Sequence, residues 1–177
     1  MALSATIHKV TLSVADMDRH YYQQHELTMA KHPSETDIRF VVRLIAFALN
    51  ATDELVFTKG LSTDDEPDIW QKSLSGELDV WIELGQVDEK RIRQACGRSR
   101  QVIIYTYHQG KSSIWWSQIQ QKLARHNNLQ VYSIDVAGAE ALVSRTMQLQ
   151  CNIDDGMVYL SDDAASFTLS VTSMKSE

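Results

Sequence analysis

The sequence predicts an α+β fold (α/β in its middle part), in which a mixed central β-sheet is flanked by helices. Residues 78–134 alternate short β-branched runs with helical patterns, as parallel strands joined by crossover helices do. Both ends of the chain instead carry apolar–polar alternation with turn residues between the runs, which indicates extra N- and C-terminal antiparallel strands. With 177 residues, of which 44% are hydrophobic, we expect a single domain spanning 1–177.

The N-terminal region predicts a hairpin followed by a helix. Residues 3–15 and 22–31 alternate apolar and polar side chains and are separated by turn residues. Ser34 is the predicted N-cap of the helix, in which apolar residues recur at helical spacing up to Leu49. Its polar line consists of Glu35, Arg39 and Arg43.

The rest of the chain predicts strands and helices in alternation, followed by a strand-rich end. A loop is expected over 60–67. The predicted strands are 55–58, 78–84, 102–107, 129–134, 148–153, 157–160 and 167–171, and the predicted helices are 88–97 and 112–126, with a helical turn over 139–147.

Composition excludes several classes of protein. The net charge of -6 argues against a protein that coats nucleic acid non-specifically. No apolar run is long enough to span a membrane and no signal peptide is recognised at the N-terminus, so we expect a cytoplasmic protein. Two cysteines without CxxC spacing indicate buried thiols, and the six histidines show no zinc-binding spacing.

The segment from Asp64 to Lys90, DDEPDIWQKSLSGELDVWIELGQVDEK, is rich in carboxylates and leads into an apolar strand. Asp79 and Glu83 fall on the same face of that strand, roughly 13 Å apart, because side chains alternate with period two. They are too far apart to share one small ion, so a second carboxylate is required from another segment. Carboxylates with a nearby lysine are the parts of a Mg²⁺ phosphodiester site, and also of a sheet edge with salt bridges.

A basic segment follows directly, with five Lys or Arg residues and no acid between Lys90 and Arg100. Arg91 and Arg93 in this segment, together with Arg39, are candidates to bind a phosphate backbone. A solvated helix face has the same composition. Trp115 and Trp116 are able to stack on bases, but core packing explains at least one of them better.

These residues form one candidate site if the first helix packs near the end of the 78–84 strand. Glu35 would orient a metal-bound water, Asp68 and Glu83 would bind Mg²⁺ (or Mn²⁺ in its place), and Lys90 would hold the attacking water or the phosphate. Asp65 and Asp79 are alternatives for the second carboxylate. Alternatively, Glu35 forms an ion pair with Arg39 on the same helix and has no role at the metal.

Four strings of the sequence carry a family resemblance that extends over essentially the whole chain. HPSETDIR, FTKGLSTDDEPDIW, LDVWIELGQVDEKRIRQAC and RTMQLQCNIDDGMVYLSDD closely resemble the YaeQ family of small bacterial proteins. The resemblance implies a restriction-endonuclease-like variant of the PD-(D/E)xK nuclease fold.

In that motif Pro67–Asp68 would be the PD, Glu83 the second acid, and Glu35 the acid from the first helix. Gly85 stands where the motif lysine is expected, which leaves Lys90, or Lys59, as the replacement cation.

Two functions are therefore expected. The first is a Mg²⁺-dependent nuclease-like protein that acts on or binds nucleic acid. The alternative is a non-catalytic adaptor or regulator on the same scaffold, which binds nucleic acid or a transcription or repair protein and whose acids are neutralised by arginines. Neither involves a membrane, and fold alone does not choose between them.

Overall fold

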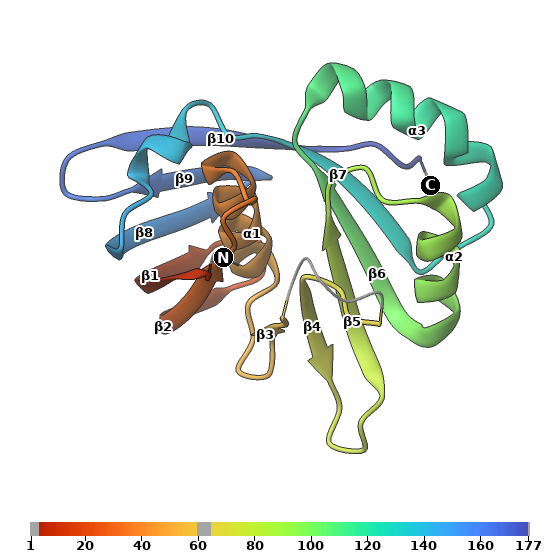
Figure 1. Cartoon of the computed structure of the whole chain (residues 1–177), viewed down its shortest axis with the longest axis horizontal. Helices are drawn as coiled ribbons and strands as arrows, with labels where there is room; N and C mark the ends of the chain where they lie inside the picture. The colour runs from red at the N-terminus through yellow and green to blue at the C-terminus, as the bar shows by residue number, and fades with distance from the viewer. Residues whose placement is uncertain (1–3, 60–64, 177) are drawn as a thin grey trace. The chain divides into compact units, whose positions relative to one another are not determined.

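The computed structural model describes residues 4–59 and 65–176 (Figure 1). The chain divides into two compact units. Unit 1 consists of Met1–Leu49 and Asp135–Val171, and unit 2 consists of Asn50–Ile134 and Thr172–Glu177. Each unit contains a mixed sheet and helix, so the predicted α+β class is confirmed.

Unit 1 is a five-stranded mixed sheet with one long helix. Its strand order is β2-β1-β8-β9-β10, and only the β1–β8 pair is parallel. Its elements are β1 (Thr6–Asp16), β2 (Tyr21–Lys31), α1 (Asp37–Asn50), the 3-10 turn η1 (Ala139–Leu142), β8 (Thr146–Asp154), β9 (Met157–Ser161) and β10 (Ser166–Ser173).

The predicted N-terminal hairpin is confirmed. β1 and β2 pair antiparallel over their whole length, from Thr6↔Lys31 to Asp16↔Tyr21. Alternate residues of β1 are buried, and α1 buries a nearly continuous run of apolar side chains. This burial on one sheet face and around the helix forms the core of unit 1.

The first helix begins two residues later than predicted. Ser34 does not cap it, because its Oγ is hydrogen-bonded to Nδ1 of His32 at 2.7 Å. Thr36 caps the helix instead, since its Oγ1 accepts the backbone N–H of Arg39 at 3.1 Å. Glu35 therefore lies just before the helix, in a turn that its own N–H closes onto the His32 carbonyl at 2.9 Å.

Unit 2 contains five strands in the order β3-β4-β5-β6-β7, with both parallel and antiparallel pairs. β5, β6 and β7 are parallel and are joined by α2 and α3, as the alternating pattern predicts. β4 was not predicted; it is a short strand that pairs antiparallel with β5. The elements are β3 (Val56–Phe57), β4 (Ile69–Lys72), β5 (Leu78–Leu84), α2 (Glu89–Arg98), β6 (Ser99–Thr106), α3 (Gln109–Leu123) and β7 (Leu129–Asp135). Residues 60–64 of the predicted loop lie outside the described residues.

Both tryptophans of α3 pack within unit 2, and the last residues of the chain return to it. Trp116 is buried and donates from Nε1 to the Met174 carbonyl at 3.0 Å. Trp115 is partly buried against the same core and donates to the Val87 carbonyl at 2.8 Å. In the part of the chain described, no helix has the length and hydropathy needed to cross a membrane.

Candidate functional site

Asp68 and Glu83 are brought together in unit 2, where Asp68 directly precedes β4 and Glu83 lies on the neighbouring strand β5. The register of β4 and β5 pairs Ile69 with Ile82, so one further step places Asp68 opposite Glu83. Both residues are buried, with 7% and 4% of their surface exposed. Oδ2 of Asp68 accepts the backbone N–H of Leu84 at 3.0 Å, which fixes its carboxylate beside the end of β5. The sheet thus creates a buried pair of acids.

Arg91 is the cation that reaches this pair. Its Nε donates to Oε1 of Glu83 at 2.5 Å, and its Nη2 donates to the Glu66 carbonyl at 2.9 Å. These contacts cross from the first turns of α2 to the end of β5 and to the segment before β4. A residue that we predicted to bind a nucleic-acid backbone is therefore an ion-pair partner of a predicted metal ligand.

The other oxygen of Glu83, Oε2, is buried and makes no hydrogen bond with any described residue. Removal from water raises the pKa of Glu83 above its usual range, and the nearby charge of Asp68 raises it further. The Arg91 guanidinium and the Trp81 indole act in the opposite direction, without cancelling the effect of burial. A buried acid with a raised pKa beside a second acid is typical of functional sites.

The remaining predicted residues of unit 2 lie away from this pair of acids or face solvent. Lys90 is exposed and makes no hydrogen bond or ion pair with the residues described. Asp65 and Lys59 are also exposed. Asp79 forms an ion pair with Arg100 at 3.5 Å and is not the second carboxylate beside Glu83.

The backbone conformation at position 85 explains why glycine, and not the lysine of the motif, stands there. Its φ is +95°, in the left-handed region that glycine adopts without strain, and its N–H donates to the Tyr105 carbonyl at 2.8 Å. The chain bends there to leave β5. A lysine at this position would have to adopt the same strained backbone.

Glu35 belongs to unit 1, where two arginines bind it. Arg39 contacts Oε2 at 2.7 Å and Arg43 contacts Oε1 at 2.8 Å, so both of its oxygens are used. The Glu35 side chain is only 2% exposed. Arg39, which we predicted to bind nucleic acid, is thus held by this acid. Arg93, the third predicted backbone-binding arginine, is about half exposed and lies 3.4 Å from Glu89.

These contacts show whether Asp68 and Glu83 are suited to hold a metal ion. Between residues 4–59 and 65–176, no three His, Cys, Asp or Glu side chains are grouped closely enough to hold an ion by themselves. Mg²⁺ commonly uses one or two carboxylates and completes its coordination with water and substrate phosphates. Oε2 of Glu83, which no described residue hydrogen-bonds and which lies next to Asp68, fits that smaller requirement.

The contact between Arg91 and Glu83 was not predicted from the sequence because it crosses from a helix to a strand. Arg91 is eight residues beyond Glu83, and the intervening turn at Gly85 determines which residue of α2 faces the strand end. The missing lysine of the motif was a usable signal that another cation was required. Spacing alone did not distinguish Lys90 from Arg91.

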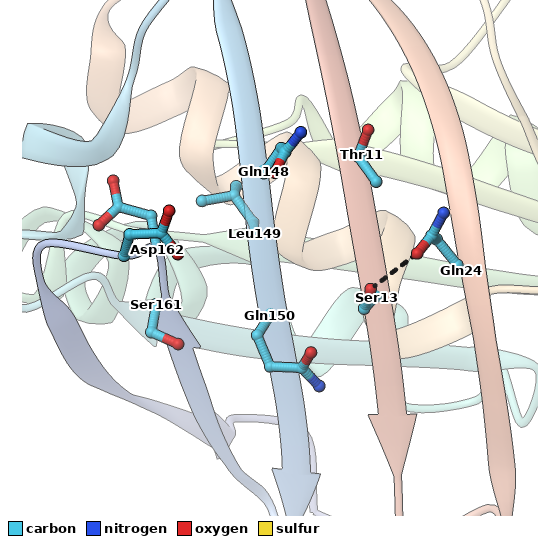
Figure 2. Close-up of a pocket in the computed structure, with 9 residues that line it drawn as sticks. Thr11, Ser13, Gln24, Gln148, Leu149, Gln150, Ser161 and Asp162 are labelled. Atoms are coloured by element: carbon cyan, nitrogen blue, oxygen red, sulfur yellow. Dashed lines mark hydrogen bonds between the residues drawn. The ribbon is translucent and has the colours of Figure 1, made fainter.

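A separate hollow of about 350 Å³ lies on the sheet of unit 1 and has a different chemistry (Figure 2). Figure 2 shows neutral hydrogen-bonding side chains on β1, β2 and β8, with Ser13 and Gln24 joined at 3.5 Å. Asp162 and Asp163 line it as well, whereas none of its described lining residues is Lys or Arg. This hollow does not suit a phosphate backbone.

Known proteins resemble the chain over nearly its whole length. The family model described as YaeQ protein matches residues 1–171. The YaeQ protein of Escherichia coli (strain K12) is 43% identical over 175 residues, covering 97% of each chain. The YaeQ protein of Salmonella typhi is 42% identical over the same share of both chains.

Two solved structures share the architecture. The YaeQ crystal structure from Xanthomonas axonopodis pv. citri has a TM-score of 0.94 and 44% identity, and covers 98% of this chain and 100% of that chain. The YaeQ crystal structure from Pseudomonas syringae has a TM-score of 0.91 and 30% identity, covering 98% and 97%. These relatives identify a family rather than an activity. The chain belongs to the YaeQ family.

Proposed function

We propose that the chain binds a divalent metal ion and a phosphodiester backbone through unit 2, as a nuclease-like protein that acts on nucleic acid. The observation that carries this proposal is the buried Oε2 of Glu83 beside Asp68, which has no hydrogen-bond partner among the residues that the structure describes. Leaving a buried polar atom without a partner costs about 1–3 kcal/mol. A cation bound at this oxygen would supply the missing partner.

Asp68 and Glu83 would hold Mg²⁺, or Mn²⁺ in its place. When bound, the ion would lower the pKa of a coordinated water and stabilise charge on the phosphate. A metal at Glu83 competes with Arg91 for the same carboxylate. A guanidinium released from Glu83 pairs well with a phosphate, to which it donates two parallel hydrogen bonds. Arg91 would then perform the role that we predicted for Lys90.

The PD-(D/E)xK variant of the fold belongs to the same proposal. Pro67–Asp68, directly before β4, and Glu83, on β5, are the two motif positions, and the opposition of Asp68 and Glu83 supports the assignment. Gly85 departs from the motif, and Arg91 is the substitute cation that we propose.

A non-catalytic adaptor, which binds nucleic acid or a transcription or repair protein, is the second candidate. Ion pairs favour it: Glu35 is bound by Arg39 and Arg43, and Glu83 is bound by Arg91. Acids neutralised in this way stabilise a scaffold without chemistry. In a non-catalytic adaptor, Arg91 would stay bound to Glu83.

Calorimetric titration of Mg²⁺ and Mn²⁺ into the wild type, Glu83→Gln and Arg91→Gln separates the two candidates. We expect saturable 1:1 binding that is lost in Glu83→Gln and becomes tighter in Arg91→Gln, because the competing cation is gone. Glu77→Gln is the control, since Glu77 is an exposed acid paired with Arg100. It should bind metal as the wild type does.

Binding would justify an assay for cleavage of single-stranded, double-stranded and structured nucleic acids with the same variants. If neither the wild type nor Arg91→Gln binds metal at millimolar concentration, the metal-dependent proposal is wrong. The adaptor would then be the function to pursue.

A further inference from the structure

The hollow on the sheet of unit 1 has a floor that the core holds in place (Figure 2). It lies over β1, β2 and β8, reaches the turn after β9, and has a volume of about 350 Å³. Its polar side chains alternate with core residues: Ser13 faces outward, whereas Leu12 and Val14 are buried on the other face of the same strand. Because β1 is also paired on both sides, the backbone under the hollow is fixed.

Strand register places four polar side chains in one row across this outward face. Ser13 pairs with Gln24 on β2 and with Gln150 on β8. Gln150 pairs in turn with Ser161 on β9. Neighbouring strands lie about 4.8 Å apart, so this polar row of Gln24, Ser13, Gln150 and Ser161 is about 14 Å long. A ligand that follows it must be elongated and must offer hydrogen-bonding groups along its length.

The hollow retains hydrogen-bonding capacity for such a ligand. Gln150 donates from Nε2 to Oδ1 of Asn152 at 2.8 Å, and its Oε1 accepts no hydrogen bond from the residues described. The side chains of Gln148 and Ser161 also line the hollow and make no hydrogen bond within the described chain. Amide and hydroxyl groups both donate and accept, so these side chains suit a ligand that does the same.

A second row beside the polar row carries a tyrosine at each end. Tyr22 pairs with Ala15, and Tyr159 pairs with Asn152. Ala15 and Asn152 pair with each other, so the four residues form one tyrosine row. Each tyrosine is two residues from a member of the polar row, which places both rows on the same face, about 7 Å apart. Tyr22 is 62% exposed and Tyr159 is 44% exposed, so both rings are accessible.

The charge around the hollow favours a neutral ligand. Asp162 and Asp163 line it, and none of its described lining residues is Lys or Arg. Lys9 lies on the same face of β1, but it donates to Thr28 at 2.8 Å and does not line the hollow. An anionic ligand would meet two carboxylates without a cation, whereas a hydroxyl group donates a strong hydrogen bond to a carboxylate.

We infer that this outward face of the unit 1 sheet binds a neutral oligosaccharide, with sugar rings on Tyr22 and Tyr159 and hydroxyl groups on the polar row and Asp163. Sugar hydroxyls donate and accept, as the amides and hydroxyls of the row do. The C–H groups on one side of a sugar ring form an apolar face, which packs on an aromatic ring. The length of the row calls for several linked sugars. The inference requires neither a metal nor the proposed function.

Two other occupants suit this face less well. A peptide needs pockets for apolar side chains, and among the lining residues only Leu149 is apolar and it is buried. Single-stranded nucleic acid stacks its bases on aromatic rings, but its phosphates require cations. At this hollow they would meet Asp162 and Asp163 instead.

Calorimetric titration of three neutral tetrasaccharides, cellotetraose, maltotetraose and tetra-N-acetylchitotetraose, tests the site. We expect saturable 1:1 binding of at least one of them, weakened at least tenfold in Tyr22→Ala/Tyr159→Ala. The control is Val56→Ala/Ile114→Ala, which truncates two side chains of similar exposure, 48% and 62%, in unit 2 and should change affinity less than twofold. No saturable binding at millimolar concentration, or equal weakening in both double variants, would overturn the inference.

The polar row and the neutrality of the ligand provide a second readout. Gln150→Ala truncates an exposed side chain and should weaken binding at least threefold, with an unchanged melting temperature as the check on folding. Added salt should leave the affinity of the wild type unchanged, because screening acts on charged ligands. Wild-type affinity in Gln150→Ala would remove the polar row from the site and contradict the inference.

Two further measurements identify a different occupant. Binding of oligothymidylate that falls with salt and is lost in Tyr22→Ala/Tyr159→Ala would assign the face to single-stranded nucleic acid. A dimer in sedimentation that the same variant dissociates would show that a second copy covers the face. Either result would overturn the oligosaccharide inference. Because these experiments contain no metal and the tested variants leave unit 2 unchanged, they succeed or fail independently of the metal-binding experiment.

Discussion

Units 1 and 2 each contain a buried glutamate bound by arginine, but the two clusters differ in how completely the acid is neutralised. Glu35 has one arginine on each oxygen, at 2.7 and 2.8 Å. Glu83 has Arg91 on one oxygen, and no described residue forms a hydrogen bond with the other. A fully paired carboxylate stabilises structure, whereas a half-paired one retains a site for a proton or a cation.

The arginines of the two clusters also differ in how far they are exposed to solvent. Arg43 is 6% exposed and also donates to the Ala30 carbonyl, so it is part of the core of unit 1. Arg91 is 26% exposed and has a path to solvent. An arginine that reaches water can leave its partner when a better anion arrives, and a buried arginine cannot do so without a large cost.

The largest effect should come from breaking the fully paired cluster. Glu35→Ala leaves Arg43 buried without its carboxylate, and we expect the free energy of unfolding to fall by about 3–5 kcal/mol in urea denaturation. Asp37→Asn is the control, because Asp37 is an exposed partner of Lys31 and should cost less than about 1 kcal/mol. Equal effects would show that Glu35 is not a structural acid.

Removing Arg91, which binds one oxygen of Glu83, should lower the free energy of unfolding by a smaller amount. Arg91→Met deletes a charged hydrogen bond worth about 1.5–3 kcal/mol, and the cost is limited because Glu83 then takes up a proton. The pKa of Glu83 should rise further, since its main stabilising cation is gone. Nuclear magnetic resonance of the labelled carboxyl carbon measures this, and an unchanged pKa would contradict the pairing.

A smaller effect should appear as a change of stability with pH. Because the pKa of Glu83 is raised on folding, the folded state binds more protons than the unfolded state above the ordinary glutamate pKa. Its contribution to stability is therefore present at low pH and is lost as the pH rises through the raised value. Glu83→Gln should remove this loss, so its stability relative to the wild type should increase from pH 4 to pH 7 in urea titrations.

The smallest effect is expected at the lysine that the sequence favoured. Lys90→Ala removes an exposed side chain without a described partner and should change stability by less than about 0.5 kcal/mol. Its metal affinity should equal that of the wild type, in contrast to Arg91→Gln. Loss of metal-dependent activity in Lys90→Ala alone would restore Lys90 as the reacting cation and remove Arg91 from that role.

Local patterns in the sequence were sufficient for the hairpin and the parallel strands of unit 2, whereas Asp68 stayed one of three candidates for the second carboxylate, with Asp65 and Asp79. These features depend on period-two alternation and on the order of elements, both of which are visible in the chain. The cap at Thr36, the strand β4 and the Arg91–Glu83 contact were missed. Each depends on which of several neighbouring residues makes a given contact. Ser34, for example, bonds to His32, and Thr36 caps the helix in its place. Only the three-dimensional structure shows which residue is used.

The parallel pairing of β1 with β8 determines when unit 1 can be completed. Lys9 pairs with Thr146, so β1 waits for roughly 137 residues of further synthesis before its second neighbour exists. At about 5–20 residues per second, this delay is about 7–30 s. Meanwhile the hairpin is only marginally stable and presents an open strand edge, whereas most of unit 2 is contiguous in the chain and is complete earlier. The nascent hairpin is therefore the segment of this protein that is most exposed to aggregation and to chaperone binding.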